Sequence, residues 1–146
     1  MAGPTSVLFT CTHNAIRSPM AEAILKHVAG SRIFVDSVGV RPGELDPFTV
    51  AVMQEIGIDL SRHRPKSFDD LEDDNFDLVI SLSPEAQHRA VEMTRTTACD
   101  LEFWNTFDPT AIEGNRETRM AAFRQVRDML LARIRERFGD LEKERA

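Results

Sequence analysis

Short apolar runs alternate along this chain with longer stretches in which apolar residues recur every three or four positions. The run SVLFT at 6–10 is short, apolar and rich in residues that favour strands, and DLVISLS at 77–83 has the pattern of a buried strand. The segments RIFVDSVGV at 32–40 and CDLEFW at 99–104 have a similar character. The pattern therefore predicts four strands.

The stretches between these strands have the periodicity of amphipathic helices. In the segment 19–30, Met20, Ile24 and Val28 fall on one face, and Gly30 is suited to end the helix. The other helical segments are 47–57, 84–94 and 116–142, and the acidic stretch 67–76 has room for a short helix. Strands and helices that alternate in this way predict an α/β fold with a parallel sheet, right-handed crossovers and helices on both faces.

Length and composition narrow the class of protein without changing this picture. The chain has 146 residues, which favours one domain over residues 1–146, and 29% of its residues are charged. A net charge of −6 argues against a general nucleic-acid binder, although local basic residues can still bind an anionic small molecule. No segment has the pattern of a signal peptide or the length of a transmembrane helix, so we expect a cytoplasmic protein without a membrane partner.

The segment CTHNAIRS at 11–18 joins the first strand to the first helix, where ligands bind in folds of this class. A short loop that leads into a helix can turn several backbone N–H groups inward, and the helix dipole adds positive potential. Arg17 can place two N–H donors on two phosphate oxygens, and Ser18 can donate its hydroxyl to the Cys11 sulfur or cap the helix. Cys11 is therefore a candidate nucleophile facing an anion, with a buried core thiol as the alternative interpretation.

Nucleophilic attack on phosphorus needs a second group that protonates the leaving oxygen. The segment TFDPTAIEG at 106–114 offers Asp108 after the fourth strand, and in a parallel sheet this loop returns to the same edge as Cys11. Pro109 restricts the backbone of the loop. The alternative for Asp108 is an ordinary turn residue before a proline.

These motifs together resemble the low-molecular-weight protein tyrosine phosphatase family. A C-x-x-x-x-x-R-S element directly after an N-terminal strand, with a D-P pair in the last third of the chain, is typical of that family, and the similarity extends over nearly the whole sequence. The resemblance implies a three-layer α/β sandwich with a four-stranded parallel sheet in the order 2-1-3-4 and helices on both faces. It also implies a cysteine-dependent phosphomonoesterase that acts through a phosphocysteine intermediate on a phosphotyrosine protein or a small aryl phosphate, without a metal or cofactor.

The same resemblance assigns roles to individual residues. Cys11 is the nucleophile, Arg17 binds the phosphoryl oxygens, and Asp108 protonates the leaving group and then activates water. The phosphate-binding loop comprises Thr12, His13, Asn14, Ala15, Ile16, Arg17 and Ser18. The side chains implied to brace this loop are Asn14, Ser18, Ser37 and His63.

Departures from the family pattern bear on the substrate. Ile16 stands where many members have a second cysteine, and His13 replaces a usual glycine. Thr110 follows the D-P pair in place of an aromatic residue, and the chain contains no tyrosine. A groove for a phenyl ring thus lacks aromatic side chains, which argues against a preference for tyrosine-phosphorylated proteins.

Relatives in the same family reduce arsenate with a similar loop, and this is the alternative function. Ser81 and Ser83 occupy the place where the thioredoxin-coupled kind carries cysteines. Cys99, at the start of the fourth strand, is expected at the opposite edge of the sheet as a buried structural thiol. A reductase built on this chain therefore requires an external thiol carrier as its partner. A module that binds phosphate without turnover is a third interpretation, against which the presence of both Cys11 and Asp108 argues.

Overall fold

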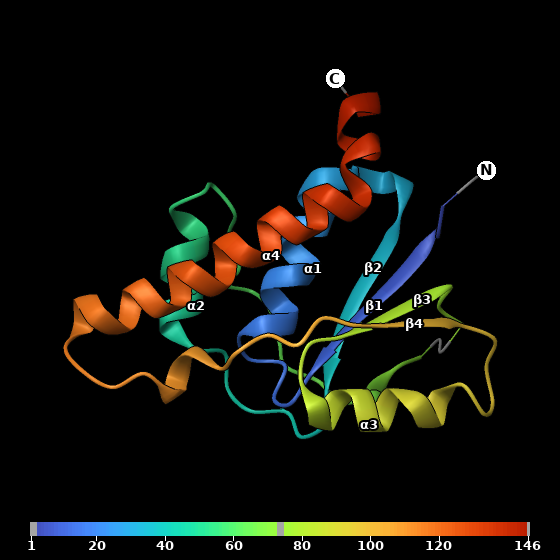
Figure 1. Cartoon of the computed structure of the whole chain (residues 1–146), viewed down its shortest axis with the longest axis horizontal. Coiled ribbons are helices and arrows are strands. Elements are labelled where there is room, and N and C mark those ends of the chain that lie inside the picture. The colour runs from blue at the N-terminus through green and yellow to red at the C-terminus, as the bar shows by residue number, and fades with distance from the viewer. Residues whose placement is uncertain (1–2, 73–74, 146) are drawn as a thin grey trace.

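Four parallel strands lie at the centre of the structure in the order β2-β1-β3-β4 (Figure 1). The strands are β1 (Ser6–Cys11), β2 (Phe34–Gly39), β3 (Leu78–Ser81) and β4 (Asp100–Phe103). This computed structural model describes residues 3–72 and 75–145 of the chain. The predicted strand order 2-1-3-4 and the parallel pairing are confirmed.

Helices cover both faces of the sheet, as predicted. They are α1 (Arg17–Ala29), α2 (Pro47–Gln54), α3 (Pro84–Met93) and α4 (Arg116–Arg145), with the short 3-10 helices η1 (Gly30–Arg32), η2 (Phe68–Asp70) and η3 (Pro109–Ala111). Buried residues of α1, α2 and α4 pack with one face of the sheet, while those of α3 pack with the other. The result is a three-layer α/β sandwich in which α4 packs across α1 (Figure 1).

The central strand β1 explains how the two cores form. Val7 and Phe9 point to the side of α1 and α4, while Leu8 points to the side of α3, because successive side chains of a strand alternate between its faces. A strand that is covered on both faces has a continuous apolar sequence rather than an alternating one. The run SVLFT at 6–10 therefore predicted this strand well.

Element ends differ from the sequence prediction by a few residues. α1 begins at Arg17 rather than at residue 19, and α2 ends at Gln54 rather than at residue 57. The short helix expected within 67–76 is reduced to η2, and residues 73–74 of that stretch lie outside the described residues. Apolar periodicity marks the buried face of a helix but not its last turn, so ends of this kind are the least predictable feature.

The longest described helix, α4, is amphipathic and strongly charged. Its apolar residues Phe123, Val126, Leu130, Ile134 and Phe138 are all buried, as their helical spacing predicted. Within residues 3–72 and 75–145, no helix combines the length and the apolar character that crossing a bilayer requires.

The carboxyl ends of the strands meet at one edge of the sheet, where the chain leaves β1 at Cys11. Because β2 lies on one side of β1 while β3 and β4 lie on the other, the segments that follow β2 and β4 approach this point from opposite sides. The loop after Cys11 is therefore enclosed by parts of the chain that are far apart in sequence.

Candidate active site

The loop between β1 and α1, residues 12–16, turns most of its carbonyl groups toward the segment that follows β2. The carbonyl oxygens of Cys11, Thr12, His13 and Ala15 accept hydrogen bonds from the N–H groups of Val40, Arg41, Gly43 and Asp46, at 3.1, 2.9, 2.9 and 3.3 Å. In a trans peptide the N–H points away from the C=O, and the described chain contains no cis peptide bond. The N–H groups of residues 12, 13, 14 and 16 therefore face the opposite side of the loop, where they form a nest of donors.

Two residues allow the backbone to take this path. Gly39, at the end of β2, lies so close to the loop that a Cβ there would sit 2.7 Å from the Asn14 nitrogen and 2.8 Å from the His13 carbonyl carbon. Asn14 has a φ of 53°, in the left-handed region that asparagine enters more readily than most residues. Close packing on Gly39 and the left-handed turn at Asn14 thus fix the shape of the loop.

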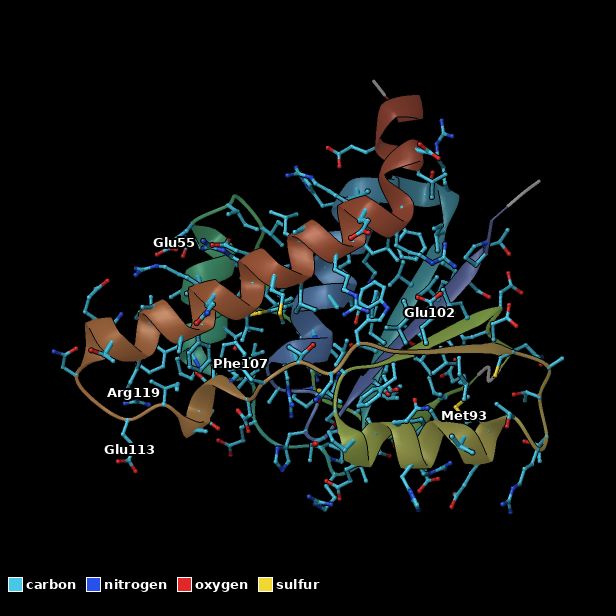
Figure 2. All side chains as sticks on the ribbon, in the orientation of Figure 1. Glu55, Met93, Glu102, Phe107, Glu113 and Arg119 are labelled. Atoms are coloured by element: carbon cyan, nitrogen blue, oxygen red, sulfur yellow. The ribbon has the colours of Figure 1, made fainter. Side chains whose placement is uncertain are left out.

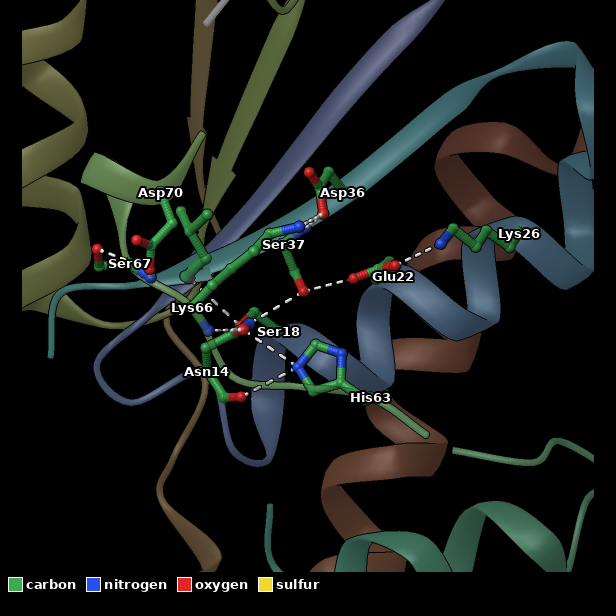
Figure 3. A network of polar contacts seen from close by, with 11 residues as sticks. Asn14, Ser18, Glu22, Lys26, Asp36, Ser37, His63, Lys66, Ser67 and Asp70 are labelled. Carbon is green, nitrogen blue, oxygen red and sulfur yellow. Dashed lines mark hydrogen bonds and ion pairs between the residues drawn. The ribbon is translucent and has the colours of Figure 1, made fainter. Parts of the chain in front are cut away.

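Asn14 is also the centre of a buried hydrogen-bond network behind the loop (Figure 3). Its Nδ2 donates to Ser18 Oγ at 2.8 Å and to Ser37 Oγ at 2.9 Å. Its Oδ1 accepts from the Lys66 N–H at 3.0 Å and contacts His63 Nε2 at 3.1 Å. The structure therefore brings together the four side chains that the family resemblance implied for bracing the loop.

The network reaches Cys11 through Ser18. Ser18 Oγ accepts from Asn14, and its own proton can go to Cys11 Sγ, which lies 2.9 Å away, or to the Val38 carbonyl oxygen at 3.5 Å. Ser37 Oγ likewise accepts from Asn14 and donates to Glu22 Oε1 at 2.5 Å. The Cys11 side chain, at the carboxyl end of β1, is thus buried against a hydroxyl donor that is held in place from behind.

His63 enters the network as a neutral donor. Burial lowers its pKa below the ordinary value of 6.5, although the charge of Glu22 and a hydrogen bond to the Asn14 backbone act in the opposite direction. Its Nε2 lies 3.2 Å from the Asn14 carbonyl oxygen and 3.1 Å from Asn14 Oδ1. Both partners are acceptors, so Nε2 carries the proton.

Two carboxylates complete the network, and the sequence analysis did not name either. Glu22 accepts the hydroxyl proton of Ser37. Asp36 accepts from the Ser37 N–H at 2.8 Å and pairs with the Lys66 ammonium at 2.6 Å. Glu22 lies one helical turn after Ser18, and Asp36 directly precedes Ser37, but neither spacing distinguishes them from ordinary surface acids.

A cavity of about 80 Å³ opens on the donor side of the loop. It is lined by Cys11, His13, Ala15, Ile16, Arg17, Asp108 and Thr110. The three residues proposed from the sequence as catalytic, Cys11, Arg17 and Asp108, thus share one cavity. Within the part of the chain that the structure describes, no three His, Cys, Asp or Glu side chains are grouped to hold a metal ion.

Other residues of the expected phosphate-binding loop direct their side chains elsewhere. Thr12 Oγ1 donates to Ser83 Oγ at 3.1 Å, next to the start of α3. The side chains of Asn14 and Ser18 belong to the network behind the loop. At positions 12 and 14 the loop thus offers the cavity only backbone N–H groups.

Arg17 connects the loop to the segment that carries Asp108. Its side chain is buried, and its Nη1 donates to the Thr106 carbonyl oxygen at 2.9 Å. A guanidinium has five N–H donors, so others remain to face an anion in the cavity. The contact with Thr106 uses only backbone, and for that reason no sequence pattern predicts it.

Asp108 is held at the first turn of η3. Its Oδ1 accepts from the Thr110 N–H at 2.9 Å and from Thr110 Oγ1 at 2.7 Å. Partial burial opposes the charged form, but the hydrogen bonds from Thr110 and the positive charges of Arg17 and His13 outweigh it, so the pKa of Asp108 lies below its ordinary value. At neutral pH the carboxylate is therefore ionised.

Phenylalanine, tyrosine and tryptophan are missing from the residues that line the cavity. Trp104 belongs to the core instead, where it packs edge-on against Phe9 with ring centroids 6.1 Å apart. Phe107 lies next to Asp108 in the sequence, on the segment between β4 and η3, and is 39% exposed (Figure 2). The lining thus contains no phenylalanine, tyrosine or tryptophan ring on which a phenyl group can stack.

Cys99 lies far from Cys11. Asp100 pairs with Leu78, and Leu78 pairs with Val7, so Cys99 lies before the level of Val7 in the sheet. Cys11 is four residues further along β1, which at about 3.3 Å per residue puts the two thiols at least roughly 13 Å apart. A disulfide requires Cα atoms within about 7 Å. The sequence analysis expected Cys99 to be buried, but it is only partly buried because it stands at the end of an edge strand.

Comparison with known proteins agrees with this geometry. The model of the family described as low molecular weight phosphotyrosine protein phosphatase matches residues 6–146. An arsenate reductase of Bacillus subtilis (strain 168) is 35% identical over 130 residues, which cover 89% of this chain and 92% of the relative. A glutaredoxin arsenate reductase of Synechocystis sp. is 30% identical, with 88% of this chain and 92% of the relative covered.

Solved structures extend the comparison to the fold. An arsenate reductase in the oxidized state superposes with a TM-score of 0.77 at 28% identity, covering 94% of this chain and 98% of the other. The tyrosine phosphatase amsI of Erwinia amylovora superposes with a TM-score of 0.74 at 21% identity, covering 92% and 91%. Because the family match extends over nearly the whole chain, this protein belongs to the low molecular weight phosphotyrosine protein phosphatase family.

Proposed function

We propose that the protein reduces arsenate through covalent chemistry at Cys11, with an external thiol as the reductant. The observation that carries the choice of arsenate is the similarity to relatives named arsenate reductases, at 35% and 30% identity. The cavity of about 80 Å³ suits a tetrahedral oxyanion group, whether free arsenate or the phosphoryl group of an ester.

In the first step, arsenate binds with its oxygens on the N–H nest and on Arg17, and the Cys11 thiolate attacks the arsenic. A sulfur–arsenic bond forms, and one arsenate oxygen leaves as water after taking up protons. The Ser18 hydroxyl, 2.9 Å from the sulfur, stabilises the thiolate before the attack. Arsenate carries ionisable protons of its own, so this step depends less on Asp108 than the cleavage of an ester does.

The reducing thiol must come from outside the chain, because Cys99 is too distant to reach Cys11. The side chain of Cys11 is only 2% exposed and lies in a cavity of about 80 Å³. A small, flexible thiol can enter such an opening. The proposed first reductant is therefore a low-molecular-weight thiol, with a thiol carrier acting after it.

Hydrolysis of phosphomonoesters is the second candidate, and the position of Asp108 in the cavity favours it. The sequence analysis ranked this activity first, while the names of the relatives favour arsenate reduction. Phosphate and arsenate have the same shape and charge, so the N–H nest, Arg17 and Cys11 suit both. The two activities differ in the nucleophile of the second step, which is water for hydrolysis and a thiol for reduction.

The two activities are separated by assaying one preparation for arsenate-dependent oxidation of glutathione and for hydrolysis of p-nitrophenyl phosphate. We expect thiol oxidation that saturates with arsenate, disappears in Cys11→Ser and persists in the matched control Cys99→Ser. Asp108→Asn should lower ester hydrolysis by about 10²-fold or more, because it removes a proton donor, but arsenate reduction by less than about tenfold.

Thiol oxidation that does not depend on arsenate, or that survives in Cys11→Ser, contradicts the proposal. Hydrolysis of the ester without any arsenate reduction establishes the second candidate in its place.

A further inference from the structure

His13 lies at the mouth of the cavity, and its position is fixed by the loop. It lines the same cavity as Cys11 and Asp108, while its side chain is exposed to solvent. Its carbonyl oxygen accepts from the Gly43 N–H at 2.9 Å. The side chain packs on the same glycine, where a Cβ would lie 3.4 Å from the His13 Cβ. His13 thus lies at the entrance of the cavity with its imidazole exposed to solvent.

Charged groups face His13 from several elements. The charge of His13 makes a small contribution to lowering the pKa of both Asp108 and Glu85. Glu85, at the start of α3, is paired with Arg41 from the segment after β2. Arg17 lines the cavity beside it.

The geometry also determines where a second nucleophile enters. Cys11 is buried at the closed end of the cavity, and the open end is bounded by His13, Asp108 and Thr110. Once arsenic is bonded to the Cys11 sulfur, a nucleophile that enters through the mouth reaches the arsenic on the side opposite that sulfur. Such in-line attack displaces the Cys11 thiolate.

A thiol needs a base at this point, because the thiolate is the nucleophile and an ordinary thiol has a pKa of about 8.5. Asp108 is a poor base, since its pKa is lowered and Thr110 occupies its Oδ1. Histidine is the side chain type that ordinarily accepts and releases a proton near neutral pH. Resting on the proposed function, we infer that His13 accepts the proton of the incoming low-molecular-weight thiol as it attacks the arsenic.

The atoms and electrons of this step balance. The thiol sulfur forms a bond to arsenic, the bond between arsenic and Cys11 breaks with its electron pair on the Cys11 sulfur, and the thiol proton moves to the His13 imidazole. Arsenic keeps its oxidation state here. Reduction follows when a second thiol attacks the sulfur of the released adduct, which gives a disulfide and leaves the electron pair on arsenic as arsenite.

The test compares thiols of different acidity in arsenate-dependent oxidation by the wild-type protein and by His13→Ala. With glutathione, which is mostly protonated at neutral pH, we expect kcat/KM for the thiol to fall by about 10²-fold, the usual effect of losing a general base. With an aromatic thiol that is already ionised, such as thionitrobenzoate, we expect a change of less than about threefold, because no proton has to be removed. Added imidazole should restore part of the glutathione rate in His13→Gly.

His88→Gln is the matched control, because His88 is exposed on α3 and does not line the cavity; it should behave as the wild type. An unchanged glutathione rate in His13→Ala overturns the inference, and so does an equal loss with both thiols, which would mean a structural role. A wild-type protein that oxidises no thiol with arsenate overturns the proposed function itself and the inference with it.

Discussion

The two sides of the loop at 12–16 are built in opposite ways. The back of the loop consists of the network residues Asn14, Ser18, Ser37 and His63, and the mouth consists of His13, Asp108 and Thr110. Asn14, Ser18 and Ser37 are fully buried and joined by hydrogen bonds of 2.8 and 2.9 Å. His13 and Thr110 are exposed, and Asp108 is only partly buried. The back therefore holds one fixed geometry, while the mouth exchanges protons with solvent.

This difference divides the tasks of the site. Attack on an oxyanion needs Cys11 and the donors of the loop held to within a fraction of an ångström, which a buried, fully bonded network provides. The choice of substrate and of second nucleophile depends on groups that substrate and solvent can reach. Changes at the back should thus affect every reaction of the site together with stability, and changes at the mouth should affect one reaction at a time.

Among the substitutions that test the difference between the back and the mouth of the loop, we expect Asn14→Ala to have the largest effect on stability and activity. The substitution removes the donor to the buried Ser18 and Ser37, and the acceptor for the partly buried His63 and for the Lys66 N–H. At about 1 kcal/mol net for each lost bond, we expect a loss of about 2–4 kcal/mol in the free energy of unfolding. Misplacement of the loop should lower arsenate reduction and ester hydrolysis together by about 10²-fold. Denaturant unfolding and the two assays measure this.

Asn14→Gly is the control that separates the side chain from the backbone. Glycine keeps the left-handed φ of 53° at no steric cost, so it should be more stable than Asn14→Ala by about 1 kcal/mol while losing the same activity. If one activity falls and the other stays, the back of the loop does not act on both reactions and the comparison is wrong.

A smaller and more selective effect is expected from Thr110→Val at the mouth. This change removes the hydroxyl that donates to Asp108 Oδ1 at 2.7 Å, so the pKa of Asp108 should rise. In ester hydrolysis the protonated acid is the active form, so the alkaline limb of the pH–rate profile should move to higher pH and the rate at neutral pH should increase several-fold. The free energy of unfolding should change by less than about 1 kcal/mol.

Arsenate reduction provides the internal control for Thr110→Val, since it depends less on Asp108 as an acid. A parallel shift of both pH profiles would mean that Asp108 serves both reactions equally. Thr118→Val, on α4 and outside the lining of the cavity, should leave both profiles unchanged.

The placement of Cys11 and Asp108 in one cavity followed from the sequence because it depends on where strands end. Alternating strands and helices imply a parallel sheet, and the carboxyl ends of its strands meet at one edge. Cys11 directly ends the first strand, and Asp108 follows the fourth strand by five residues. That placement was enough to predict a shared site without knowing any side-chain contact.

The back of the loop did not follow from local sequence, because its residues meet only through packing. Ser37 and His63 were assigned by family resemblance, and Glu22 was not assigned at all, since its contact depends on how α1 lies on β2. The side chain of Thr12 bonds to Ser83, so this residue offers the cavity only its backbone N–H. Spacing along a helix or strand indicates which face a residue occupies but not which partner it meets there.

The smallest expected effect is the contribution of His63 to the pH dependence of stability. Burial lowers the pKa of His63 below 6.5 in the folded protein, so as pH falls below about 6.5 the unfolded chain takes up this proton first and folding becomes less favourable. His63→Gln keeps an N–H donor for Asn14 but removes the titration, so its melting temperature should fall less steeply between pH 6.5 and 5 than that of the wild type. Parallel curves for the two proteins would show that His63 is not held neutral. The back of the loop would then take up protons as the mouth does, and the two sides would not differ in this respect.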